Sequence, residues 1–120
     1  MQSPIEVVNL DFNPFNILIE NGQISGVIDW EGACAGDCTF DLATLLFYSY
    51  DIPEVREQLL HTIRERVSPG ILSVYMAHMI LRQVDWSIRY HDRATVDYYL
   101  RVAKNILQDV GALFDKERKI

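Results

Sequence analysis

The chain has 120 residues, 49% of them hydrophobic and 23% charged, which is the composition of an ordinary globular domain with room for one core. The net charge of −6 offers no basic stripe to neutralise phosphates, so we expect no nucleic-acid partner. The apolar run 70–81 is too short to cross a bilayer, and no basic and apolar leader opens the sequence. Two cysteines make no disulfide framework. We therefore expect a cytoplasmic protein without a membrane partner.

β-Structure is predicted near the N-terminus. Residues 5–8 form an extended segment. Residues 16–20 and 23–28 contain β-branched side chains and flank Asn21-Gly22, a pair that tolerates the positive φ angles of a type I′ turn. The pattern predicts a β-hairpin from Asn16 to Ile28.

Helical patterns fill the rest of the chain. We expect a buried helix over 40–50, a second that Asp51 caps and that runs to residue 67, a third from a break at 68–70 to about residue 90, and a last over about 91–114. Residues 115–120 are expected to fray. The residues expected to face the core from the last three helices are Val55, Leu59, Leu60, Ile63, Val67, Ile71, Tyr75, Met79, Leu81, Val96, Tyr99, Leu100, Ala103, Ile106, Leu107 and Val110.

The most informative spacing lies before and after the hairpin. Four residues separate Asp11 from Asn16, and Asp29 follows the second predicted strand. In kinase catalytic loops an aspartate and an asparagine at this spacing orient the acceptor hydroxyl group and hold Mg²⁺, and a later aspartate is a second metal ligand. Taken alone, each residue is better explained as a turn or strand-end residue that satisfies local backbone groups, and the three together favour the metal site. Because a hairpin returns its second strand beside the first, we expect Asp29 to lie near Asn16, with Asp11 at the entrance of the loop.

The pattern Asp-x-x-x-x-Asn-Ile-Leu, an Asn-Gly hairpin, Gly-Val-Ile-Asp-Trp and Gly-Asp-x-x-x-Asp-Leu-Ala runs through residues 8–46. It resembles the C-terminal lobe of aminoglycoside phosphotransferases, within a wider group of choline and homoserine kinase-like small-molecule kinases. The resemblance implies that Asp11 is the catalytic base and that Asn16 and Asp29 bind Mg²⁺ and, through it, ATP or GTP. It also implies that Asp41 braces the catalytic loop through buried hydrogen bonds to the backbone of 9–11, and that Asp37 opens the turn before the helix of Asp41. The later helices match only in pattern.

Two features depart from the family pattern. Asn9 stands where the family has a histidine that supports the loop; its amide still forms hydrogen bonds, so we expect weakened support. The family's N-terminal lobe carries a glycine-rich loop and a phosphate-pairing lysine, whereas here no Gly-x-Gly-x-x-Gly occurs and the lysines are Lys104, Lys116 and Lys119. We therefore expect that the N-terminal lobe is absent or supplied by a second chain, and that the isolated chain is inactive.

Other candidates have simple structural explanations. Cys34 and Cys38 lie in a predicted loop, with no further cysteine or nearby histidine to complete a metal site. The three histidines fall on different predicted helices without ligand spacing: His61, His78 and His91. An aromatic and acidic set lines either an acceptor pocket or a helix–helix seam, and the seam is the commoner arrangement. It consists of Trp86, Tyr90, Tyr98, Tyr99, Asp85, Asp92 and Asp97.

The sequence thus predicts one α/β domain, with a catalytic loop and short hairpin region (1–38), about four packed helices (39–114) and a tail (115–120). Its predicted function is that of the C-terminal lobe of a phosphotransferase that acts on a hydroxyl group of an aminoglycoside-like or amino-alcohol acceptor. The alternative is a non-catalytic binding or assembly module. Apolar faces around Ile17, Ile19 and 71–81 exceed what the chain can cover, so we expect a homodimer in which residues 4–8 pair with the partner or cross onto it.

Overall fold

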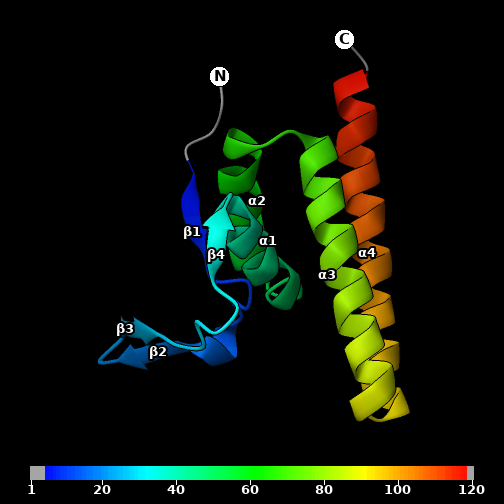
Figure 1. The fold of residues 1–120 in the computed structure, drawn as a ribbon. Coiled ribbons are helices and arrows are strands. Elements are labelled where there is room, and N and C mark those ends of the chain that lie inside the picture. Colours follow the sequence, from blue (N-terminus) through cyan, green and yellow to red (C-terminus); the bar gives the residue numbers. More distant parts are fainter. Residues whose placement is uncertain (1–4, 119–120) are drawn as a thin grey trace.

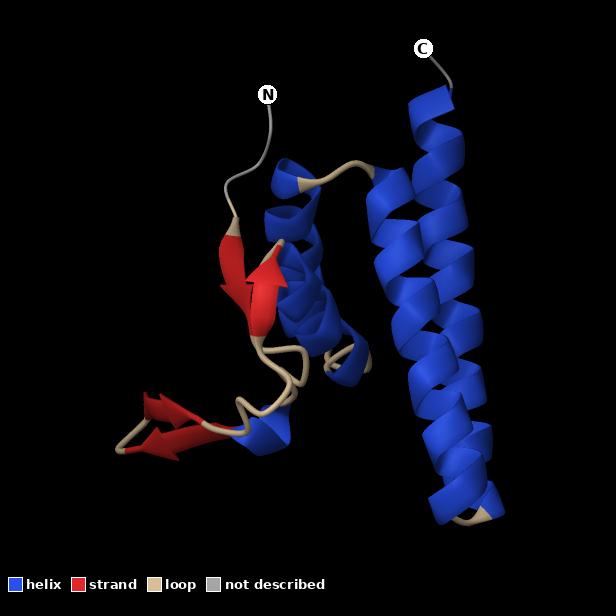
Figure 2. Cartoon of the chain, viewed as in Figure 1, coloured by secondary structure: helices blue, strands red, loops and turns tan. Residues whose placement is uncertain are grey.

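Two small antiparallel sheets and four α-helices make up residues 5–118, the part of the chain that the computed structural model describes (Figure 2). Side chains are described up to residue 113. The strands are β1 (Glu6–Val8), β2 (Ile17–Glu20), β3 (Gln23–Val27) and β4 (Cys34–Gly36); the helices are α1 (Thr39–Tyr48), α2 (Pro53–Arg66), α3 (Pro69–Tyr90) and α4 (Arg93–Arg118). A short 3-10 helix, η1, covers Pro14–Asn16. The α+β class agrees with the sequence prediction.

The predicted hairpin is formed by β2 and β3, which pair in antiparallel register with Ile17 opposite Val27. Asn21 and Gly22 make the turn with φ angles of 53° and 75°, the left-handed values that a type I′ turn requires. The hairpin projects away from the helices (Figure 1). As a result its apolar side chains are exposed, including Ile19 and Ile24, which are each 68% exposed.

A second sheet pairs β1 with β4, and the sequence analysis assigned β4 to a loop. Val7 lies opposite Ala35 in antiparallel register. A Cβ atom at Gly36 would lie 3.3 Å from Cγ2 of Val8, so a residue without a side chain suits this close approach. The segment Cys34–Gly36 has few β-forming side chains, and it becomes a strand because β1 lies beside it.

The core lies where α1 packs on α2 and α3, and where α3 runs antiparallel to α4 as a long pair (Figure 1). Its central side chains are Ala43, Leu46, Phe47, Tyr50, Ile63, Leu72, Met76, Met79, Val102, Ile106 and Val110. Within residues 5–118, no helix is long and apolar enough to cross a membrane.

Some helix predictions were wrong in detail. Ile52, not Asp51, is the N-cap of α2, and no side chain of the described residues caps the helix. The Asp51 carboxylate accepts a hydrogen bond from the Tyr98 hydroxyl of α4. The last helix continues to Arg118, past the predicted end at residue 114; residues 119–120 lie outside the described part. Four side chains expected to face the core are exposed because the α3–α4 seam uses neighbouring positions: Ile71, Leu81, Leu100 and Leu107.

Candidate functional site

The loop between β1 and β2 is closed by its own asparagines. The Asn13 side chain accepts a hydrogen bond from the Phe15 N–H at 2.9 Å and caps η1. The N–H of Asn13 donates to the carbonyl of Asp11 at 2.9 Å, and the N–H of Asn16 donates to the carbonyl of Asn13 at 3.0 Å. These local bonds fix the path of the chain from Asp11 to Asn16.

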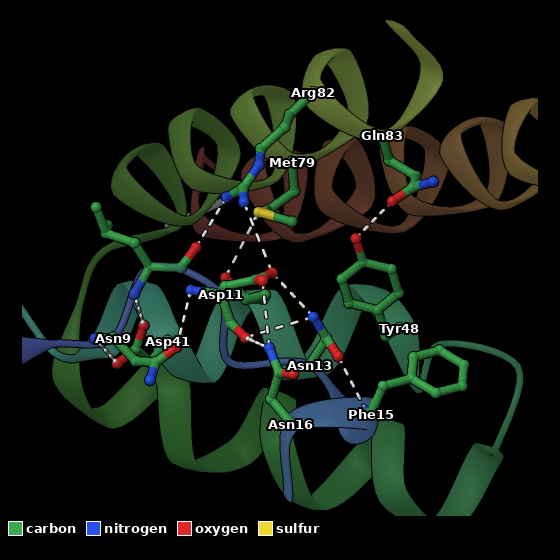
Figure 3. Close-up of polar contacts among 12 residues, drawn as sticks. Asn9, Asp11, Asn13, Phe15, Asn16, Asp41, Tyr48, Met79, Arg82 and Gln83 are labelled. Atoms are coloured by element: carbon green, nitrogen blue, oxygen red, sulfur yellow. Dashed lines mark hydrogen bonds and ion pairs between the residues drawn. The ribbon is translucent and has the colours of Figure 1, made fainter. Parts of the chain in front are cut away.

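The Asp11 carboxylate is held by both asparagine amides (Figure 3). Asn13 Nδ2 donates to its Oδ1 at 2.8 Å, and Asn16 Nδ2 donates to its Oδ2 at 3.2 Å. Asn16 Nδ2 also donates to the Asp11 carbonyl at 2.8 Å. The structure therefore brings Asp11 and Asn16 together, and the direction of these bonds turns the Asn16 amide oxygen away from the carboxylate.

Asp41, at the start of α1, holds the other end of the loop. Its Oδ2 accepts from the N–H of Asn9 at 2.7 Å, and its Oδ1 accepts from the N–H of Leu10 at 3.1 Å. These are the backbone partners that the sequence analysis predicted, although Asp41 is only half-buried. Leu10 has a φ of 70°, a left-handed conformation that is uncommon for a leucine and costs free energy unless its surroundings hold it.

Asn9 is a buried residue that forms a hydrogen bond to the backbone of the same loop. It is 1% exposed, and its Oδ1 accepts from the N–H of Asp11 at 3.0 Å. Its Nδ2 is buried and has no hydrogen-bond partner among the described residues. Asn9 thus gives the loop one hydrogen bond and keeps one buried donor unpaired among the described residues, which is costly. Weaker support than a histidine would give stays a prediction.

Arg82 of α3 joins the site, and the sequence analysis missed it. Its guanidinium donates to the Leu10 carbonyl at 2.8 Å, and its other terminal nitrogen lies 3.6 Å from Oδ1 of Asp11. Arg82 is far from Asp11 in sequence, so no local pattern links them. The available signal was a cation three residues after Met79, which is buried, because positions i and i+3 share a helix face.

Asp29 lies two residues beyond the end of β3, and its side chain is exposed. The N–H of Ile28 donates to the Asn16 carbonyl at 2.9 Å. The backbone just before Asp29 therefore lies beside Asn16. Asp29 has a φ of 64°, a strained value for a residue other than glycine and one that clusters at functional sites. The described residues include no group of three or more histidines, cysteines, aspartates or glutamates placed to hold a metal ion. Convergence of the Asp29 carboxylate on Asp11 and Asn16 thus stays a prediction.

Asp37 occupies the turn before α1, as predicted. Its Oδ1 accepts from the N–H of Thr39 at 3.0 Å, and its Oδ2 accepts from the Tyr75 hydroxyl at 2.7 Å. Burial raises the pKa of Asp37, but the hydrogen bonds from Tyr75 and Thr39, together with the charge of Arg66, outweigh it and bring the pKa below its ordinary value. Asp37 therefore links the β4–α1 turn to α3.

A cavity of about 490 Å³ opens beside Asp11. Its lining residues are Asp11, Asn13, Tyr48, Arg82, Gln83, Asp85 and Trp86. The Tyr48 hydroxyl donates to Gln83 Oε1, and burial raises the pKa of Tyr48 to about 12. Gln83 Nε2 donates in turn to Ser87 Oγ at 3.0 Å, which fixes this wall of the cavity.

The aromatic side chains lie in two different surroundings. Trp86 lines the cavity and packs against Tyr90, with 4.4 Å between ring centroids. Tyr99 instead stacks on Phe47 at the core. The two cysteines, Cys34 and Cys38, are free.

Comparisons with known proteins found related sequences. The model of the phosphotransferase enzyme family matches residues 4–72. Hygromycin-B 4-O-kinase from Escherichia coli is 40% identical over 42 residues, which make up 35% of this chain and 12% of that protein. The chain therefore aligns with a small part of that relative's length. No solved structure matches the chain.

Proposed function

The chain belongs to the phosphotransferase enzyme family, and from this we propose that it carries the catalytic loop for transfer of the γ-phosphoryl group of a nucleotide to a hydroxyl group of a small molecule. The observation that carries the proposal is the Asp11 carboxylate, held by Asn13 and Asn16 at the edge of the cavity. Residues 1–38 and the helices of 39–114 would together correspond to part of a kinase-like C-terminal lobe.

Asp11 is proposed as the general base. A base must lie within about 2.6–3.2 Å of the hydroxyl oxygen whose proton it accepts. Asp11 lines the cavity, its side chain is 37% exposed, and the amides of Asn13 and Asn16 fix its orientation. A hydroxyl group in the cavity can thus reach the carboxylate without a change in the loop.

Asn16 and Asp29 are proposed as the Mg²⁺ ligands. Kinases of this family generally use ATP and Mg²⁺, and the ion neutralises charge on the phosphates when bound. The residues fit such an ion in donor type, because Mg²⁺ prefers oxygen ligands and keeps several waters. Asn16 donates both of its described amide bonds to Asp11, which leaves its Oδ1 for a cation, and Asp29 presents an exposed carboxylate.

The cavity beside Asp11 is proposed as the acceptor site. Trp86 supplies a flat apolar surface, and Asp85 adds a second carboxylate to that of Asp11. A polar compound that carries both hydroxyl and amino groups matches this lining, because an amino group pairs with a carboxylate. We therefore propose an aminoglycoside-like or amino-alcohol acceptor; the name of the E. coli relative describes a kinase for hygromycin B.

Calorimetric titration of the chain with Mg²⁺-ATP tests the proposal. We expect weak, millimolar binding, because the sequence has no glycine-rich phosphate loop. Asp29→Asn should weaken it further, whereas Asp97→Asn, which removes the same charge from an exposed position on α4, should not. Equal effects of the two substitutions, or no binding by the unchanged chain, would argue against the proposed metal site and favour a non-catalytic module.

A further inference from the structure

Arg82 connects α3 with the backbone of the loop and with the Asp11 carboxylate. One edge of its guanidinium is anchored on the Leu10 carbonyl at 2.8 Å, and the terminal nitrogen of its other edge lies 3.6 Å from the Asp11 carboxylate. The second distance is longer than a charge-assisted hydrogen bond. The side chain is 45% exposed, and the hydrogen bond to the Leu10 carbonyl uses only one of the five N–H donors of the guanidinium.

The side chains that line the cavity include more acidic than basic groups, so the position of the Arg82 cation matters for binding a phosphoryl group. Two of the seven lining residues, Asp11 and Asp85, are acidic, and only Arg82 among those seven is basic. Asp85 is paired with Arg89, whereas the cation beside the Asp11 carboxylate is Arg82. A phosphoryl group that approached Asp11 would therefore meet Arg82 as the compensating charge. Phosphoryl transfer depends on neutralising the charge that is spread over the three equatorial oxygens.

We propose that Arg82 binds the phosphoryl group during transfer, an inference that rests on the proposed function. In that step the acceptor oxygen forms a bond to the γ-phosphorus as the bond from phosphorus to the β–γ bridging oxygen breaks. The hydroxyl proton passes to Asp11, and the electron pair of the broken bond stays on the nucleoside diphosphate. Arg82 contacts the equatorial oxygens of the phosphoryl group, because the planar fork of a guanidinium matches the spacing of phosphate oxygens.

The distances agree with this role. The acceptor oxygen lies about 2.6–3.2 Å from the base and about 3–3.5 Å from phosphorus in a reactive arrangement, so the phosphorus lies roughly 5–6 Å from the carboxylate. A guanidinium nitrogen that lies 3.6 Å from Asp11 reaches that position by a small side-chain rotation. The Leu10 bond keeps the guanidinium at the loop during this movement.

A purely structural Arg82 would hold Leu10 and nothing more, and the two roles differ in their nucleotide dependence. To test this, the full isotope-labelled chain is titrated with Mg²⁺-ATP and, separately, with Mg²⁺-ADP. Binding is followed by the chemical-shift changes in its NMR spectrum. Arg82→Gln should weaken ATP binding about tenfold and leave ADP binding unchanged, because only ATP carries the γ-phosphoryl group. Arg82→Lys keeps the charge and should recover part of the loss.

Arg89→Gln is the matched control. Arg89 lies seven positions along the same helix, close to the same face, and its ion pair is with Asp85 rather than Asp11. It should leave the ratio of ATP to ADP affinity unchanged. Equal weakening of ATP and ADP by Arg82→Gln, or no weakening, would overturn the inference and leave the proposed function standing. If Arg82→Gln does not fold, the ratio of ATP to ADP affinity is measured for Arg82→Lys instead, and a ratio equal to that of the unchanged chain would overturn the inference. An unchanged chain that binds neither nucleotide would overturn both proposals.

Discussion

Asp41 and Leu10 are 31 positions apart in sequence, yet Oδ1 of Asp41 accepts a hydrogen bond from the N–H of Leu10 at 3.1 Å. Leu10 forms a second hydrogen bond, in which its carbonyl accepts from the Arg82 guanidinium at 2.8 Å. The left-handed backbone of Leu10 is thus held between α1 and α3. This double attachment explains how a strained residue next to Asp11 keeps its conformation.

Asp41→Ala should destabilise the fold by about 2–4 kcal/mol, because it strands the N–H groups of Asn9 and Leu10. Asp41→Asn keeps one acceptor oxygen and should cost less. Chemical denaturation measures both, with the exposed Asp97→Ala as a control that should change little. An Asp41→Ala variant as stable as the unchanged chain would show that water replaces the carboxylate without loss.

Asp37 should make stability depend on pH in the acid range. Its pKa in the folded chain lies below the ordinary value of 3.8, so its hydrogen bonds from Thr39 and Tyr75 stabilise the fold fully above that pH. That stabilisation is lost as the pH falls through the folded-state pKa. Thermal melts from pH 6 downward, run on the unchanged chain and on Asp37→Asn, should show a smaller acid-induced drop for the variant. Parallel curves would contradict this.

The parts that sequence predicted well depend on local chemistry. Asn21-Gly22 prefers the φ angles of its turn in any context, and the spacing from Asp11 to Asn16 sets a short capped loop. Asp41 was placed through a family pattern. Arg82 and β4 were missed because each acquires its role from a distant partner: Leu10 for Arg82, and β1 for β4. Leu81 was placed inward because periodicity alone does not fix which face of α3 meets α4.

The chain alone should transfer no measurable phosphoryl group from ATP to aminoglycosides or choline. Positioning of the phosphates supplies most of the catalysis in this reaction, and the sequence has no Gly-x-Gly-x-x-Gly loop. A radiolabelled transfer assay checks this. Turnover that Asp11→Asn abolishes would show that the nucleotide is held in another way, and would at the same time confirm Asp11 as the base.

The chain should self-associate through the hairpin. Ile19 and Ile24 are cross-strand partners on one face and are each 68% exposed, and exposed apolar surface that gathers into a large patch often marks a protein–protein interface. Light scattering should give a dimer mass that Ile19→Glu converts to a monomer mass. Ile88→Glu, on α3 and 65% exposed, is the matched control and should leave the dimer intact. A monomer mass for the folded, unchanged chain would contradict the prediction.

Asn16 and Asp29 are proposed to hold the metal ion of a phosphotransferase beside Asp11. The most direct measurement is paramagnetic broadening of the NMR signals of the labelled chain by Mn²⁺-ATP, because Mn²⁺ takes the same oxygen ligands as Mg²⁺. We predict that the amide signals of Asn16 and Asp29 and their neighbours broaden first, and that Asp29→Asn removes the effect while Asp97→Asn does not. Broadening centred on another part of the chain, or broadening that persists in Asp29→Asn, would contradict the assignment.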